Sequence, residues 1–398
     1  MVLRRAYNIA DLQAAARRRL PGVVWRFVEG GAEDEVTLRA NRAAYEAIHF
    51  APRALLDVSQ RSQKVSVFGI PYDAPFGVSS MAPLGLCRYE GDLKVARAAR
   101  AANVPFMLST HAFVSLPRVA AEAGAAPWFQ TYLPGDRDRA AAEIERASRA
   151  GCEVLVVTVD VPMRGNREYN ERNGLGLSMR LGTRAVAQGL VHPAWLCDVY
   201  FRSIFGRKVG ESKTRRDMHD WRDFDWLREH WRGKLVIKGI LTVEDARLAM
   251  EHGADGIGVS NHGGRQLDCA PATLEVLPQI AAAVGGRIAV FADGGVRRGA
   301  DIVKLLALGA DMAFFGRPAL YGVTAAGEDG ARRALEILRT EVDRVLAFLG
   351  CSSIAELGPQ HLRLPTLMPA RRIVAEPQGP DPVRVHRLER GAGGGSSD

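Results

Sequence analysis

The segment VSNHGGRQLD, residues 259–268, holds two side chains that together can abstract a proton and bind an anion. His262 and Arg265 lie three residues apart directly after an apolar run, and the intervening glycines let the backbone pass close to a ligand. An imidazole beside a guanidinium suits proton removal from an anionic substrate. A lone histidine is more often structural, so the prediction of a catalytic base depends on the surrounding motifs.

Two further segments combine glycine with arginine, namely ADGGVRRGAD (292–301) and FFGRP (314–318). Glycine amides, a helix N-terminus and an arginine are the usual components of a phosphate site after the last two strands of an α/β barrel. A plain tight turn is the alternative for DGG alone. Two such turns in succession favour phosphate binding.

Lys238 ends the apolar run LVIKG. A charge there is costly unless an anionic group lies nearby, so we expect Lys238 to face a site and stabilise negative charge. The alternative is a lysine whose ammonium simply reaches solvent at the strand end.

The elements that would position these residues form a regular pattern. From residue 74 onward, short apolar runs alternate with longer amphipathic stretches, which is typical of parallel strands joined by helices. We count eight such units, with strands beginning at Ala74, Pro105, Pro127, Val154, Leu235, Asp255, Ile288 and Met312. Eight units predict an α/β fold with a single (β/α)8 TIM barrel, and an open doubly wound sheet is the alternative.

Three segments lie outside this repeat. Residues 1–73 predict an N-terminal cap of one or two helices followed by a hairpin, and residues 74–370 form the barrel. Residues 163–233 make a long insertion after the fourth strand, and a connection of this length is usually functional or disordered. Residues 371–398, rich in Gly, Pro and Arg, predict a flexible tail.

Composition excludes several classes of protein. With 398 residues, 47% hydrophobic and 25% charged, the chain is globular rather than disordered. Its five cysteines share no disulfide or metal-ligand spacing, so we expect no metal and a reduced cytoplasmic setting. Neither a secretory signal nor an apolar stretch of about 20 residues is present. The net charge of +8 selects no partner by itself, and without a nucleic-acid-binding signature we expect no nucleic-acid partner.

Taken together, these motifs resemble the FMN-dependent 2-hydroxy acid oxidases and dehydrogenases, the family of glycolate oxidase, lactate dehydrogenase and mandelate dehydrogenase. The resemblance rests on SNHGGRQLD, DGGVRRGAD, VIKG, FQTY and TVDVP, with GGAEDE near the N-terminus, in the order expected for the family. It extends from about residue 7 to about residue 365 and is greatest toward mandelate dehydrogenase.

The resemblance implies a role for each matching residue. His262 would be the base, Asp160 its anionic partner, and Tyr132 a hydroxyl that contacts the substrate or the developing charge. Arg167 and Arg265 would bind the substrate carboxylate.

It also implies FMN as the cofactor, with Lys238 at the edge of the flavin that becomes negative on reduction. The other residues implied to contact FMN are Pro83, Gly85, Ser109, Gln130, Thr158, Asp293, Gly295, Arg297, Gly316 and Arg317.

Three positions bear on the substrate and the acceptor. Phe27 stands where many relatives have a tyrosine that contacts the carboxylate, which implies weaker binding or a more apolar pocket. Gly85 matches mandelate dehydrogenase, whereas several oxidases have alanine, and this favours a dehydrogenase with a quinone-like acceptor over an oxidase that uses O2. His111 replaces a bulky aromatic residue of glycolate oxidase and favours a larger 2-hydroxy acid.

The insertion interleaves apolar residues with clustered cations over residues 194–216. Such a segment suits the surface of an anionic bilayer, and the corresponding segment of mandelate dehydrogenase is its membrane anchor. A lid over the barrel is the other interpretation. The first would place the protein at the inner face of the cell membrane, and the resemblance also implies a homotetramer.

Overall fold

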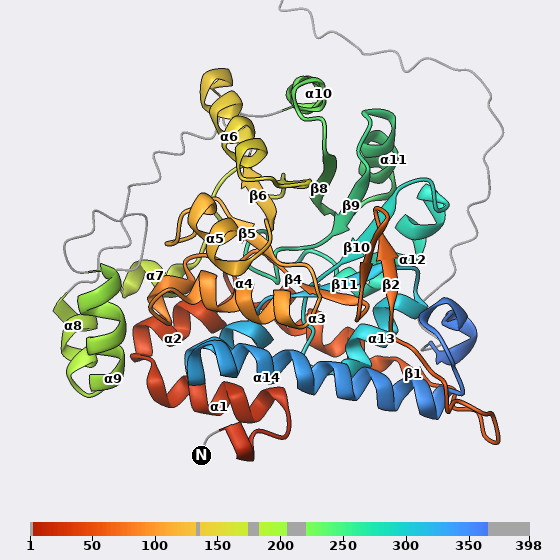
Figure 1. Ribbon diagram of the computed structural model, residues 1–398, viewed down its shortest axis with the longest axis horizontal. Coiled ribbons are helices and arrows are strands. Elements are labelled where there is room, and N and C mark those ends of the chain that lie inside the picture. The colour runs from red at the N-terminus through yellow and green to blue at the C-terminus, as the bar shows by residue number, and fades with distance from the viewer. Residues whose placement is uncertain (1–2, 133–135, 174–182, 205–219, 365–398) are drawn as a thin grey trace, which may run out of the picture. The chain divides into compact units, whose positions relative to one another are not determined.

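A computed structural model describes residues 3–132, 136–173, 183–204 and 220–364. Its centre is an eight-stranded parallel sheet in the order β4-β11-β10-β9-β8-β7-β6-β5 (Figure 1). A parallel bridge between Val78 and Phe106 joins the two edge strands, and the Val78 amide donates to the Pro105 carbonyl at 2.9 Å. The sheet is therefore a (β/α)8 barrel, as the sequence predicts. The predicted tail, 371–398, lies outside the described residues.

Each predicted barrel strand is present. The eight strands are β4 (Phe76–Val78), β5 (Met107–Ser109), β6 (Trp128–Tyr132), β7 (Val154–Thr158), β8 (Lys234–Ile240), β9 (Gly256–Val259), β10 (Ala289–Ala292) and β11 (Met312–Phe315). Most of their residues are buried, as expected for parallel strands that are covered on both faces.

Helices follow the strands around the barrel. They are α4 (Gly91–Ala101), α5 (Leu116–Ala123), α6 (Arg137–Arg149), α10 (Trp221–His230), α11 (Val243–Glu251), α12 (Thr273–Val284), α13 (Gly299–Ala307) and α14 (Arg317–Leu349), with the short η2 (Leu84–Leu86) after β4. Within α14 the backbone departs from helical angles at Ala326 and Gly327, where Gly327 has a φ of +66°. Among the described residues, no helix has the length and apolar character needed to cross a membrane.

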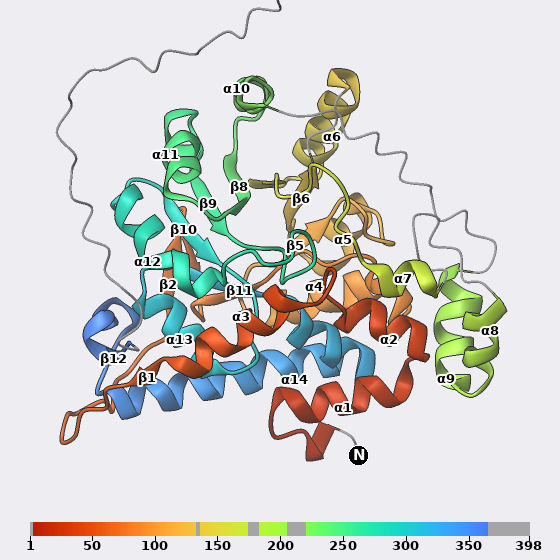
Figure 2. The ribbon, with the colours of Figure 1, turned by 180° about the vertical axis from the view of Figure 1, so that it is seen from behind.

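The N-terminal segment has three α-helices, where the sequence predicts one or two. After η1 (Leu3–Arg5) come α1 (Ile9–Arg19), α2 (Gly22–Glu29) and α3 (Val36–Ala47). The helical segment is interrupted at Pro21, which precedes α2, and in the loop 30–35, where Glu33 and Glu35 have positive φ. Figure 2 shows α1 alongside α14, which places the N-terminal segment against the barrel.

Short strands complete the described part of the chain. The predicted hairpin is β2 (Val65–Val67) paired with β3 (Ile70–Tyr72), while β1 (His49–Phe50) pairs with β12 (Leu362–Arg363). Two short helices, η4 (Ile354–Glu356) and η5 (Pro359–His361), precede β12.

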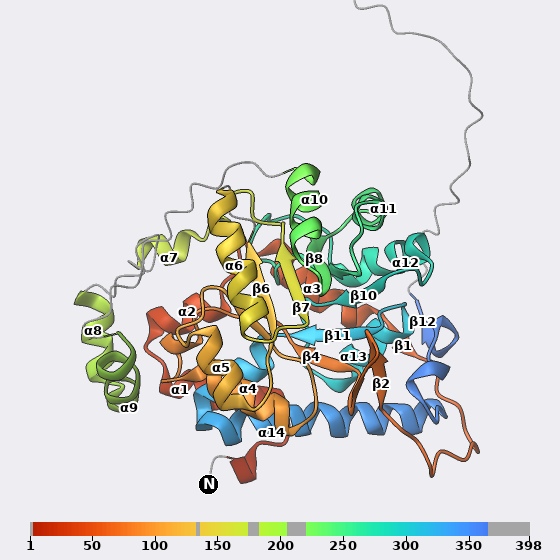
Figure 3. The same cartoon turned by 45° about the horizontal axis from the view of Figure 1, so that its top comes forward.

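The insertion after β7 contains several short helices. They are α7 (Glu168–Arg172), α8 (Thr183–Leu190), α9 (Pro193–Trp195) and the π-helix η3 (Leu196–Ile204). Figure 3 shows α8 and α9 beside α1 and α2, away from α6 and α10. Trp195 is fully buried and its indole donates to the Leu86 carbonyl at 2.8 Å, so this part of the insertion is attached to η2.

Candidate active site

The register of the barrel strands places three predicted site residues side by side. Tyr132 of β6 pairs with Thr158 of β7, which pairs with Lys238 of β8. One step lower, Ser109 of β5 pairs with Gln130 of β6. These residues come from distant parts of the sequence, and parallel pairing brings them to one rim of the barrel.

Lys238 is the most buried charge at this rim, with only 6% of its surface exposed. Its Nζ lies 3.0 Å from Asp293 Oδ2 and donates to Ser260 Oγ at 2.8 Å. Burial alone would lower the pKa of Lys238, but the carboxylates of Asp293 and Asp160 raise it above its usual value. The ammonium is therefore present at neutral pH, and it lies against Asp293 and Ser260 and not in solvent.

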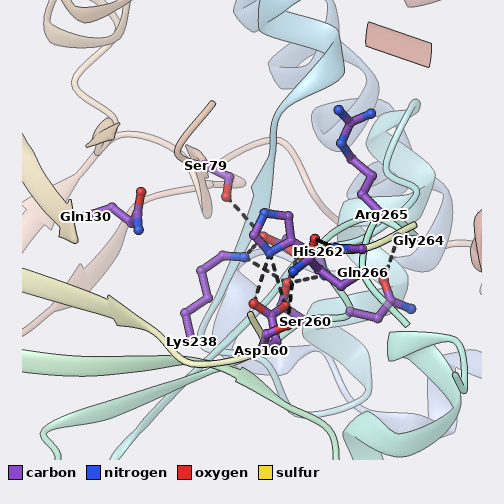
Figure 4. Close-up of polar contacts among 12 residues, drawn as sticks. Ser79, Gln130, Asp160, Lys238, Ser260, His262, Gly264, Arg265 and Gln266 are labelled. Atoms are coloured by element: carbon purple, nitrogen blue, oxygen red, sulfur yellow. Dashed lines mark hydrogen bonds and ion pairs between the residues drawn. The ribbon is translucent and has the colours of Figure 1, made fainter. Parts of the chain in front are cut away.

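His262 and Asp160 form the second hydrogen-bonded pair. Nδ1 of His262 lies 3.0 and 3.2 Å from the two carboxylate oxygens of Asp160 (Figure 4). Because an ionised carboxylate only accepts, Nδ1 carries the proton and Nε2 is the basic nitrogen of the neutral ring. Burial would raise the pKa of Asp160, but His262 and Lys238 lower it below its usual value. Asp160 is thus an anion that can stabilise an imidazolium.

Ser260 joins these two pairs and is a site residue that the sequence analysis missed. Its hydroxyl donates to Asp293 Oδ1 at 2.6 Å and accepts from the His262 amide at 3.1 Å. That second bond supports the left-handed backbone of His262, whose φ is +57°. Ser79, also missed, donates to Asp293 Oδ2 at 3.0 Å. The sequence signal that could have identified both serines is their position. Ser260 lies two residues before His262 in the motif VSNHGGRQLD, and Ser79 directly follows β4.

Arg265 lies on the same loop as His262, but its side chain extends away from Lys238 and Asp160 (Figure 4). Its guanidinium donates to the carbonyls of Phe27 at 3.0 Å and Gly30 at 2.6 Å, at the end of α2. Burial, and then the charges of Arg167 and Arg317, lower the pKa of Arg265 well below its usual value. An anion bound here would relieve this repulsion, so the position suits a carboxylate ligand.

Arg317 reaches the same helix end from the start of α14. Its Nε donates to the Val28 carbonyl and its Nη2 to the Glu29 carbonyl, both at 3.1 Å. Burial and then Arg297 lower the pKa of Arg317. Arg297 follows Gly295, whose φ of +80° only glycine adopts readily. The predicted phosphate residues therefore gather cationic charge that a phosphate would neutralise.

The remaining predicted residues have more ordinary surroundings. His111 lies against Tyr132 with ring centroids 5.3 Å apart and ring planes tilted by 31°, and Gln130 is buried. A Cβ at Gly85 would lie 2.2 Å from the Phe113 ring, so packing against Phe113 already requires glycine there. Asp293, which the resemblance assigns to FMN, is in this structure the direct counter-ion of Lys238.

FMN fits this set of residues. The buried Lys238 ammonium and the amide of Gln130 suit the carbonyl edge of a flavin, and the hydroxyls of Ser109 and Thr158 add polar contacts. Arg297 and Arg317 provide the cationic groups that a terminal phosphate requires.

Comparison with known proteins identifies the family of this chain. The model of the FMN-dependent dehydrogenase family matches residues 16–364. The chain is 37% identical to (S)-mandelate dehydrogenase of Pseudomonas putida over 90% of this chain and 94% of the relative. It is 41% identical to 4-hydroxymandelate oxidase of Amycolatopsis orientalis, over 87% and 95% of the two chains. It is 38% identical to L-lactate dehydrogenase of Chromohalobacter salexigens, over 88% and 94%.

Solved structures give the same result. The crystal structure of the monotopic membrane protein (S)-mandelate dehydrogenase matches with a TM-score of 0.82 and 36% identity, over 90% of this chain and 99% of that one. Mandelate oxidase with benzoyl-formic acid matches with a TM-score of 0.78 and 40% identity, over 89% and 97%. The chain therefore belongs to the FMN-dependent dehydrogenase family and is an FMN-dependent oxidoreductase of 2-hydroxy acids.

Proposed function

We propose that this enzyme is a dehydrogenase that oxidises an (S)-2-hydroxy acid, mandelate-like or lactate-like, to the 2-oxo acid. The observation that carries the proposal is the His262–Asp160 pair next to the buried Lys238 ammonium. In the reaction the substrate loses two electrons and two protons. FMN supplies the two-electron acceptor, and an organic molecule such as a quinone then takes the electrons and becomes a quinol.

Each residue of the site has a role that follows from its charge. Nε2 of His262 takes one proton from the substrate, and Asp160 stabilises the imidazolium that results. Arg265 and Arg167 bind the substrate carboxylate, because the positive charge of Arg167 lowers the pKa of Arg265 and a bound anion would offset that repulsion. Lys238 stabilises negative charge at the barrel rim, and Tyr132 contacts the substrate oxygen.

Features of the pocket support a substrate larger than glycolate. Tyr132 offers aromatic surface, and the exposed His111 lies against it with ring centroids 5.3 Å apart. Phe27 also lies under the Arg265 guanidinium at 5.6 Å, so an aryl substituent and a carboxylate can be bound side by side.

The choice of a dehydrogenase over an oxidase rests on the likeness to mandelate dehydrogenase. An oxidase that reduces O2 to H2O2 is the second candidate, because oxidases are among the similar proteins.

An anaerobic screen tests the proposal. Glycolate, (S)-lactate, (S)-mandelate and longer 2-hydroxy acids are mixed with the oxidised enzyme while the flavin absorbance is followed. We expect (S)-mandelate or (S)-lactate to bleach the flavin, and a quinone analogue to restore the colour faster than air-saturated buffer. Rapid return of colour with O2 and stoichiometric H2O2 would establish the oxidase instead.

We also propose that the insertion contacts an anionic bilayer at the inner face of the cell membrane. On its described part, Leu190, Val191 and Phe201 are exposed by 68%, 76% and 54%, while Trp195 and Val199 are buried. Asp198 binds Arg19 and Arg88, each at 3.1 Å, so the apolar surface is presented on an anchored element. The cationic residues at 207–216 lie outside the described residues.

Vesicle sedimentation distinguishes a membrane contact from a lid. We expect the protein to pellet with vesicles containing anionic lipid and to remain in the supernatant with neutral ones. Charging the apolar surface with Val191→Asp should reduce pelleting without changing the rate of flavin reduction. A homotetramer, also proposed, is tested by light scattering after size-exclusion chromatography.

A further inference from the structure

Gln266 lies between the two loops that carry the acid–base pair and the substrate arginines. It follows Arg265 in the loop after β9, and its side chain is buried, with 8% of its surface exposed. The facing loop, residues 160–167 after β7, begins with Asp160 and ends with Arg167. The amide of Gln266 contacts that loop at both ends.

The four hydrogen-bonding positions of this amide are all used. Oε1 accepts from Arg167 Nη2 at 2.9 Å and from the Gly165 amide at 3.3 Å. Nε2 donates to the carbonyls of Asp160 at 3.3 Å and Met163 at 3.4 Å. An amide has two donor hydrogens and two acceptor lone pairs, so no other side chain of this size could make the same set.

Close contact between the loops is built into the backbone as well. A Cβ at Gly165 would lie 2.4 Å from the Arg265 carbonyl and 2.7 Å from Cα of Gln266. Nε of Arg167 donates to that same Arg265 carbonyl at 3.0 Å. One edge of the Arg167 guanidinium is therefore held by two consecutive residues of the other loop.

Arg167 needs such a restraint because its charge repels that of Arg265. Arg167 is one of the charges that lower the pKa of Arg265, so the two guanidinium groups repel each other. Without a bound anion, like charges on flexible side chains separate. A fixed acceptor at Arg167 Nη2 opposes that separation and keeps both cations ready for one carboxylate.

We propose that Gln266 is the positioning residue of Arg167, and that its amide sets the affinity of the enzyme for the substrate carboxylate. This inference rests on the proposed role of Arg167 in binding that carboxylate. Gln266 takes no proton and touches no reacting atom in the proposal. Its effect should therefore fall on binding more than on the chemical step.

Gln266→Leu tests this directly, because leucine is apolar and cannot make any of the four bonds. We expect KM for the 2-hydroxy acid that bleaches the flavin in the anaerobic screen to rise about tenfold to thirtyfold, with kcat changed by less than about threefold. The Kd for oxalate, a dicarboxylate that is not oxidised here, should rise by a similar factor when measured by perturbation of the flavin spectrum. FMN content and Tm show whether the variant is folded. Gln360→Leu, on an exposed residue, is the matched control and should leave all four quantities unchanged.

A second variant covers the case in which Gln266→Leu does not fold. Gln266→Glu keeps the acceptors for Arg167 and Gly165, but its carboxylate neutralises the Arg167 charge that the substrate carboxylate needs. KM and the oxalate Kd should again rise while kcat is largely retained. A fall in kcat at unchanged KM in either variant would overturn the inference.

A double-mutant cycle separates positioning from general structural support. If Gln266 acts through Arg167, the KM of the double variant Gln266→Leu, Arg167→Leu should equal that of Arg167→Leu alone. Additive effects would overturn the inference and leave the proposed function intact. If no 2-hydroxy acid bleaches the wild-type flavin, the proposed function fails, and the inference fails with it.

Discussion

The two ends of the barrel strands are held together by different forces. At the N-terminal end, Phe68 of the β2–β3 turn and three barrel residues, Trp128, Phe291 and Phe314, form an aromatic cluster with ring centroids 5.4–5.9 Å apart. Within this cluster the Trp128 indole donates to the Tyr72 hydroxyl at 3.3 Å.

The opposite rim is a network of directional bonds among Lys238, Asp293, Ser260, His262 and Asp160. Every one of these contacts involves an ionised group, a hydroxyl or a backbone amide. A closed barrel allows this division because one end can supply stability through packing while the other bears buried charge that costs free energy. Substitutions at the two ends should therefore affect different measurements.

The largest effect is expected for His262→Ala. Loss of the base should lower the rate of anaerobic flavin reduction by about 10²- to 10⁴-fold, which is the usual contribution of a general base. The yellow colour should remain, because His262 is not assigned to FMN. Stopped-flow absorbance measures the rate. Flavin bleaching at the wild-type rate would refute the role of His262.

At the other end, Trp128→Ala should act on stability. Truncating this buried side chain, which is 5% exposed, should lower the free energy of unfolding by about 3–5 kcal/mol. The rate of flavin reduction per bound FMN should change by less than about twofold. Phe348→Ala, at a residue 73% exposed, is the control and should cost less than about 0.5 kcal/mol. A large loss of rate in folded Trp128→Ala would contradict the division between the ends.

A pH series tests how much the ionised Asp160 contributes to the stability of the charged rim. Its pKa is lower in the folded protein than its usual value, so its ionised form contributes stability above the pKa of the unfolded chain. That contribution is lost as the pH falls through the folded pKa. We therefore expect the wild type to be more stable than Asp160→Asn at pH 6, with the difference shrinking below about pH 4. Urea unfolding at each pH measures it, and a constant difference would contradict the assignment.

The smallest effect is expected for Phe27→Tyr. A hydroxyl added beside the Arg265 guanidinium should provide one more hydrogen bond to the substrate carboxylate and lower KM about fivefold to tenfold. The free energy of unfolding should change by less than about 1 kcal/mol. An unchanged KM would show that the Phe27 ring does not face the carboxylate.

Much of the site could be predicted from one motif. In SNHGGRQLD, Asn261 exchanges amide hydrogen bonds with Asn41, and Gly264 accepts from the Ala32 amide. Asp268 accepts from the amides of Val36 and Thr37 at the start of α3. The motif is thus one loop that contacts the N-terminal segment and carries both His262 and Arg265. A short contiguous segment of this kind can be recognised directly in a sequence.

The sequence by itself determined the eight strands, because alternating apolar and amphipathic runs have a local physical cause in burial on both faces of a parallel sheet. It also determined the residue types at the strand ends. Only the tertiary structure decided which of them pair. The counter-ion of Lys238 is Asp293, the guanidinium groups of Arg265 and Arg317 meet at one helix end, and Gln266 holds Arg167. These contacts join residues separated by tens to hundreds of positions. Their partners are selected by strand register and loop packing, which no local pattern encodes.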